Sequence, residues 1–134
     1  MAAILRVYGI MLLKGMGQTL LMTLLTLVIA TIIGMIFGLM NVGHNRVLNL
    51  IGTVYVDAIR GVPLIVLAYF VFFGIPAGMQ GMGMRGFRLS ALQAGTIALS
   101  LNCGAYMAEI IRAGIESVDR GQMEASRSLG LSYG

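Results

Sequence analysis

The sequence contains few of the residues from which soluble enzymes build sites. Of its 134 residues 10% are charged, and it has one cysteine, one histidine, two prolines and no tryptophan. A lone cysteine excludes an intrachain disulfide, and a lone histidine excludes an H-E-x-x-H zinc site. The single lysine, Lys14, follows no Gly-x-x-x-x-Gly run, so there is no Walker A phosphate loop, and no G-x-S-x-G elbow occurs. We therefore expect neither catalysis by this chain nor a cofactor.

What the sequence does contain is apolar. The hydrophobic fraction is 58%, above the roughly 45–50% of globular proteins, and the mean hydropathy is +0.92. The net charge of +4 comes from Lys and Arg residues that lie between apolar runs and form no basic face. This pattern disfavours a nucleic-acid partner and is typical of span ends in lipid. We predict an all-α integral membrane protein.

The first long apolar run, residues 19–40, carries no charge. At about 1.5 Å per residue it reaches about 33 Å, enough to cross a hydrocarbon core of about 30 Å. It is longer than a signal-peptide core, so we expect the span itself to direct targeting. The preceding residues 1–17 suggest a short interfacial lead-in.

A stripe of small residues recurs every four positions within this span. Small residues let a second membrane helix approach closely, although they are also common in membrane helices in general. The stripe favours a helix contact with an unidentified partner helix. It consists of Thr26, Ala30, Gly34 and Gly38.

A second apolar run, residues 48–75, is interrupted near its middle. Proline cannot continue a helix but suits the first turn of a new one. We therefore predict an interfacial helix to about Ile59 and a second span over about residues 63–78, which Pro76 and Gly78 close. The break between them is assigned to Arg60, Gly61 and Pro63.

Two polar segments connect the spans. Residues 41–46 form a turn with the only histidine, His44, which we interpret as a solvated residue rather than a ligand or switch. Residues 77–88 are rich in Met and Gly. Thioethers can bind Cu(I), but without a nearby Cys or His a flexible surface loop is favoured. No metal site is predicted.

The third span, residues 89–111, carries several polar side chains. Asn102, Tyr106 and Glu109 fall on one helical face, which favours either a substrate path or hydrogen bonds to another helix. We select Asn102 and Glu109 as the candidate path residues. Charges of alternating sign then continue at helical spacing out of the span, through Glu109, Arg112, Glu116 and Arg120. In the second segment, Asp57 and Arg60 are also spaced to form a pair.

The end of the chain is polar and must leave the hydrocarbon. Residues 122–129 contain good helix formers, and Gly130 follows, where glycine readily takes the left-handed turn that ends a helix. A helix of about eight residues is too short to be stable alone in water. We therefore expect it to pack against another surface, as a docking element.

Three stretches resemble one family. Glu124-Ala125-Ser126, three residues and Gly130 are similar to the start of the EAA loop of binding-protein-dependent ABC importer permeases, with Ser126 in place of the second Ala. Residues 55–64 are similar to the F-R-G-T-P-L run of the polar amino-acid permeases of the histidine, glutamine and arginine type. Residues 101–118 are similar to their L-N-x-x-A-Y-x-A-E-I-x-R-G-G-I-x-S-V run.

The resemblance implies a MetI-like type I ABC importer transmembrane domain in the bacterial inner membrane. Such a permease subunit would form the path for a polar amino acid with a second, identical or different, permease subunit. A solute-binding protein would deliver substrate from outside, and separate ABC ATPase subunits would dock on a cytoplasmic coupling segment, about residues 119–134. By resemblance, coupling falls to Gly121, Glu124, Ala125, Ser126 and Gly130.

Charge alone does not orient the chain, because four basic residues fall on one side and five on the other. Only the resemblance puts the tail inside. Family members continue with the rest of the EAA loop and usually two more spans. We therefore expect residues 1–134 to be the N-terminal part of a permease domain that transports nothing alone. The alternative is a small non-transporting scaffold whose tail docks a soluble partner.

Overall fold

The computed structural model describes residues 2–131, and for residues 2–7 and Arg120 it describes the backbone alone. Residues 132–134 of the predicted coupling segment lie outside it. Within the described range the chain is helical and contains no strand, which confirms the all-α prediction. The elements are α1 (Ala2–Val42), α2 (Arg46–Gly61), α3 (Leu64–Tyr69), the π-helical η1 (Phe70–Gly74), α4 (Ile75–Gly81), α5 (Ala91–Glu116) and α6 (Arg120–Ser128).

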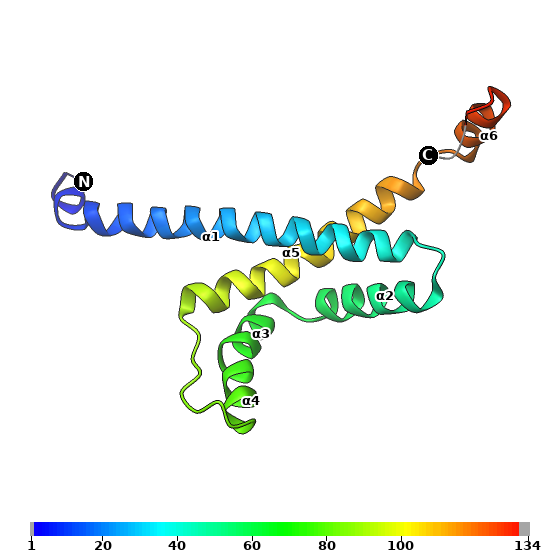
Figure 1. Ribbon diagram of the computed structural model, residues 1–134. Helices are drawn as coiled ribbons and strands as arrows, with labels where there is room; N and C mark the ends of the chain where they lie inside the picture. Colours follow the sequence, from blue (N-terminus) through cyan, green and yellow to red (C-terminus); the bar gives the residue numbers. More distant parts are fainter. Residues whose placement is uncertain (1, 132–134) are drawn as a thin grey trace.

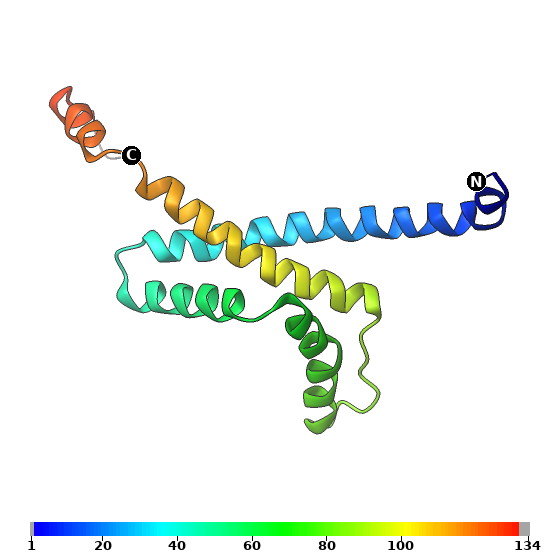
Figure 2. The same ribbon diagram turned by 180° about the vertical axis from the view of Figure 1, so that it is seen from behind.

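Two long helices organise the molecule. In Figures 1 and 2, α5 lies across α1, α2 runs back along the C-terminal half of α1, and α3 to α4 turn aside as an arm. The short α6 lies beyond the end of α5, away from the N-terminus of α1. Three stretches are long and apolar enough to cross a membrane: Tyr8–Val42, Leu64–Gly81 and Ala91–Glu116.

The small-residue stripe of α1 packs against α5. A Cβ added at Gly34 would lie 2.6 Å from Met107 Cβ, and one added at Gly38 would lie 3.0 Å from the Ala108 backbone oxygen. Ala30 is buried on the α1 side and Ala108 on the α5 side. The helix partner that the sequence left open is therefore α5, and the contact is close enough to require glycine.

The N-terminal segment corrects one expectation. α1 is helical from Ala2 onward, so residues 2–17 belong to the same helix as the first span rather than to a separate lead-in. No proline interrupts this stretch, and the glycines Gly9, Gly15 and Gly17 lie in open space, so nothing there ends the helix.

A second correction concerns α2. Asn45 caps its start, because the side-chain oxygen accepts the backbone N–H of Val47 (3.0 Å) and of Leu48 (3.4 Å). The tight turn sends α2 back along α1, not across its end as an interfacial helix would lie (Figure 1). Its outward side exposes apolar residues, among them Leu50 and Val54. α2 therefore adds an apolar surface beside the first span.

The predicted end of the second span is also wrong. Pro76 and Gly78 do not close the helix, which continues to Gly81. Pro76 has no N–H and its ring would crowd the carbonyl four residues earlier. The turn before it widens into η1, where the Ile75 N–H donates to the Phe70 carbonyl, and Pro76 then occupies the first turn of α4. The wider turn accommodates the proline without ending the helix.

The arm is held to α5 by a small apolar core. Leu67 and Val71 pack with Ala94 and Ala98 near the start of α5. α5 itself begins with a capping box, in which the Ser90 hydroxyl accepts the Gln93 N–H and the Gln93 side chain accepts the Ser90 N–H. The arm is thus packed against the first turns of α5.

Candidate functional site

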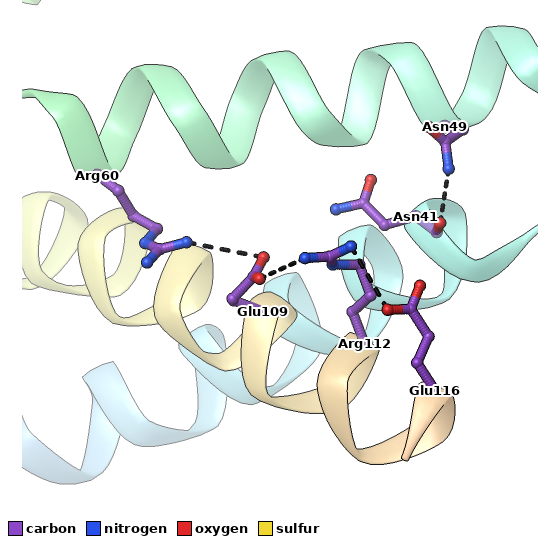
Figure 3. Close-up of polar contacts among 6 residues, drawn as sticks. All are labelled: Asn41, Asn49, Arg60, Glu109, Arg112 and Glu116. Carbon is purple, nitrogen blue, oxygen red and sulfur yellow. Dashed lines mark hydrogen bonds and ion pairs between the residues drawn. The ribbon is translucent and has the colours of Figure 1, made fainter. Parts of the chain in front are cut away.

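Polar side chains gather where the end of α2 meets the C-terminal half of α5. Arg112 Nη2 donates to Glu109 Oε1 at 2.5 Å, and Arg60 Nη1 lies 3.7 Å from Glu109 Oε2 (Figure 3). Arg112 also pairs with Glu116, at 3.5 Å. Each of these side chains is between 30% and 53% exposed, so the cluster faces outward from the described helices and is not sealed inside them.

Arg60 belongs to this cluster through two contacts. Its guanidinium lies 5.3 Å from the centroid of the Tyr106 ring, in addition to the ion pair with Glu109. Among the described residues Arg60 makes no ion pair with Asp57, so the pairing predicted from their spacing is wrong. Arg60 sits in the last turn of α2, where its long side chain can cross to α5 and meet a carboxylate.

The predicted polar face of α5 is only partly brought together. Tyr106 and Glu109 share Arg60 as a partner, whereas Asn102 is half-buried and takes part in none of these contacts. The other polar residues of this helix differ in their surroundings. Thr96 and Ser100 are buried, and their hydroxyls have no hydrogen-bond partner among the described residues.

The helix break separates α2 from the arm. α2 ends at Gly61, Val62 and Pro63 are extended, and α3 starts at Leu64. A nearby hydrogen bond from the Tyr55 hydroxyl to the Leu101 backbone oxygen (2.8 Å) ties α2 to α5. The break therefore begins two residues after Arg60, at the edge of the polar cluster.

A second polar contact fixes the other end of α2. The Asn49 side chain donates to the Asn41 backbone oxygen at 2.6 Å (Figure 3). The Asn41 side chain is itself buried, lies against Gly52, and its Oδ1 has no hydrogen-bond partner among the described residues. Gly52 makes room for this amide, because a Cβ there would overlap with Asn41 Oδ1.

Several members of these contacts are not among the site residues expected from the sequence. Arg112, Glu116 and Tyr106 enter the sequence analysis only through their helical spacing, and Asn41 only as part of a turn. The spacing of Glu109, Arg112 and Glu116 was a sufficient signal for the two pairs within α5. No local pattern links Arg60 to Glu109 or Asn41 to Gly52, because those contacts join different helices.

The exposed helix α6 has defined ends. Asp119 caps its start, with its carboxylate accepting the Gly121 N–H at 2.6 Å. At its other end the Leu131 N–H donates to the Ser126 carbonyl (3.1 Å) and the Gly130 N–H to the Arg127 carbonyl (3.0 Å). This pattern is a Schellman motif, and Gly130 has the positive φ, +79°, that it requires. The predicted helix end at Gly130 is therefore observed.

The surface of α6 is almost wholly exposed. Figures 1 and 2 show the helix apart from the others, and Gly121, Glu124 and Ala125 are all exposed. Apolar side chains are exposed with them, including Met123 and Leu129. The alternating charges predicted from Glu109 to Arg120 do not continue along one helix, because α5 ends at Glu116. The side chain of Arg120 is not among those that the structure describes.

Among residues 2–131 there is no group of three or more His, Cys, Asp or Glu side chains placed to hold a metal ion. The described side chains instead form ion pairs at the side of an apolar helical bundle, and α6 is exposed beyond the end of α5. These features, with the three candidate spans, are those of a polytopic helical membrane protein. The chain belongs to the family of binding-protein-dependent transport system inner membrane components, whose model matches residues 30–134.

Individual relatives point to amino-acid permeases. The chain is 39% identical to the probable glutamine ABC transporter permease protein GlnM of Bacillus subtilis (strain 168), over 92% of this chain and 54% of that protein. It is 37% identical to the arginine transport system permease protein ArtQ of the same organism, over 91% of this chain and 53% of that protein. The chain thus spans about half the length of the curated relatives it matches.

A solved structure supports the similarity to amino-acid ABC transporters. It is described as "Crystal structure of an amino acid ABC transporter with histidines", and it matches with a TM-score of 0.72 and 34% identity over 92% of this chain and 58% of that chain. The resemblance to amino-acid ABC permeases and the MetI-like transmembrane fold expected from the sequence are therefore confirmed.

Proposed function

We propose that residues 1–134 are the N-terminal part of a permease subunit of an ATP-driven importer for polar amino acids. The observation that carries this proposal is the combination of the family match over residues 30–134 with an exposed, well-capped α6. The permease is not itself the ATPase, and hydrolysis takes place in a separate subunit. Two permease subunits, identical or different, form the path, and a solute-binding protein supplies the amino acid from outside.

The coupling role rests on the isolation of α6. A helix of nine residues gains little stability by itself in water, yet this one has an N-cap and a Schellman end and stands away from the bundle. A groove on an ATPase subunit supplies the missing packing surface. Glu124 offers a charge contact there, Ala125 and Ser126 allow close approach, Gly121 keeps the first turn free of side-chain bulk, and Gly130 makes the turn.

The orientation follows from this docking. If α6 meets a cytoplasmic ATPase, the α1–α2 turn lies on the same side and the loop before α5 lies outside. In this proposal the spans lie within the helical stretches Tyr8–Val42, Leu64–Gly81 and Ala91–Glu116, and the segment from about residue 119 is cytoplasmic.

The substrate path runs beside the polar face of α5. Asn102 and Glu109 are the residues proposed to line it, with Glu109 held in place by Arg60 and Arg112. A partly exposed carboxylate with two arginines suits a zwitterionic substrate, which carries both charges. The alternative of a non-transporting scaffold explains the spans and the exposed α6 equally well, but it gives no reason for the family match.

Co-purification of the full-length permease with candidate ATPase subunits tests the proposal. Gly130→Asp removes the residue suited to a φ of +79° and adds a charge beside α6, so the expected result is loss of the ATPase with membrane insertion intact. Gly81→Asp is the matched control, since Gly81 is also exposed with open space around it but lies at the end of α4. If no ATPase accompanies the wild-type protein, the coupling role is wrong and the scaffold becomes the better description.

A further inference from the structure

A groove of about 450 Å³ is lined by the turn that follows α1 and by the N-terminal half of α2. It is separate from the ion-pair cluster of Glu109 and from α6, and the proposed function makes no use of it. Its lining residues are Gly43, His44, Arg46, Asn49, Leu50 and Thr53.

The lining suits an anion that carries oxygen atoms. It includes a guanidinium, an imidazole, an amide and a hydroxyl, all able to donate hydrogen bonds, and it includes no carboxylate. In the described part of the chain Arg46 has no ion pair or hydrogen bond to its side chain, whereas Arg60 and Arg112 are paired with Glu109 and Glu116. The forked guanidinium of arginine fits a phosphate well.

The position of the groove relative to the membrane favours one kind of anion. The uncharged run of residues 19–40 is long enough to cross the hydrocarbon core, and with this run as the crossing segment the polar turn after Val42 falls near the lipid headgroups. Directly beside the groove, the outward side of α2 exposes the apolar residues Val47, Leu50 and Val54. A phosphate that enters alone would leave this apolar strip unused, whereas a phospholipid would place its headgroup in the groove and an acyl chain along α2.

We propose that the groove binds the phosphate headgroup of an anionic phospholipid, with Arg46 as the principal contact and Leu50 against the start of the acyl chain. His44 and Thr53 donate further hydrogen bonds to the headgroup. Basic pockets between membrane helices bind anionic headgroups by the same combination of charge and apolar surface. This site stands on the membrane fold and the groove, and not on ATPase coupling.

Native mass spectrometry of the assembled transporter, with the full-length permease, tests the site. The protein is exchanged into detergent containing either phosphatidylglycerol or phosphatidylcholine, and the retained lipids are counted. Wild type should retain phosphatidylglycerol in preference to phosphatidylcholine. Arg46→Gln should lower that retention roughly fivefold, the effect of losing one arginine near a membrane surface. Arg46→Lys keeps the charge and should keep the preference.

Arg85→Gln is the matched control. It removes the same charge from the loop between α4 and α5, at the far end of α5 from the groove (Figure 1), and should leave lipid retention unchanged. Equal retention of the two lipids by wild type, or retention by Arg46→Gln equal to wild type, would overturn the proposal. Displacement of phosphatidylglycerol by millimolar inorganic phosphate would also overturn it, because the site would then take the free anion.

Discussion

Arg60 Nη1 of α2 lies 3.7 Å from Glu109 Oε2 of α5. In the described part of the chain this ion pair joins two helices, whereas both pairs of Arg112 lie within α5. Arg60 stands two residues before the break that leads into α3. The Glu109 carboxylate therefore links α5 to the last turn of α2, next to the point where the chain changes direction.

The first prediction compares the two partners of this pair. Glu109→Gln leaves Arg60 without an ion pair and Arg112 with Glu116 alone, so we expect it to lower the free energy of unfolding by about 1–3 kcal/mol. Arg60→Gln leaves the Glu109–Arg112 pair in place, and since the side chains are partly exposed its effect should stay below about 1 kcal/mol. Thermal unfolding of the full-length protein in detergent measures both. Equal losses from the two variants would mean that Glu109 does not serve both arginines.

The sequence was informative where the deciding interaction is local. The apolar run of the first span and the turn at Gly130 depend on neighbouring residues, and they predict helices at or near their observed places. The small-residue stripe also predicted a close helix contact correctly.

The sequence does not predict which helices contact one another, or through which residues. Arg60 had an equally good local candidate in Asp57, and only the path of α2 back along α1 brings it to Glu109 instead. A proline such as Pro76 can either end a helix or deform it, and the local sequence does not decide between the two. Here the packing of Leu67 and Val71 on α5 favours continuation of the helix through the widened turn. The roles of Asn102 and α6 in transport stay predictions, since they depend on subunits outside this chain.

The second prediction concerns the closest approach of α1 and α5. Gly34→Ala adds a Cβ 2.6 Å from Met107 Cβ and close to the backbone of α5, so the helices must separate. Overpacking of this kind costs about 1–3 kcal/mol. Gly114→Ala is the control, because a Cβ at Gly114 meets open space. Thermal unfolding should show a lower midpoint for Gly34→Ala alone. An unchanged midpoint would show that α1 and α5 do not pack as closely as described.

The third prediction tests whether the Asn41 amide needs the space that glycine leaves at position 52. Gly52→Ala places a methyl group where Asn41 Oδ1 lies, and should destabilise the protein by about 1–3 kcal/mol. Asn41→Ala removes that amide, so the double variant should recover much of the loss. A double-mutant cycle on the free energy of unfolding measures the coupling. Strictly additive effects would contradict the contact.

The last prediction tests the backbone conformation of Gly130 separately from steric contacts. A Cβ at this position meets nothing within 4 Å, so substitution causes no clash and only the φ of +79° is at issue. Gly130→Ala should destabilise the Schellman end of α6 by about 1–2 kcal/mol, because an L-residue is disfavoured in the left-handed region, whereas Gly130→Asn should cost less. If α6 binds an ATPase in its folded form, that penalty weakens ATPase binding by roughly five- to thirty-fold. Titration of the ATPase onto the reconstituted permease measures it. The order wild type, Asn, Ala in affinity supports docking through a preformed α6, and equal affinities would mean that the turn at Gly130 plays no part in coupling.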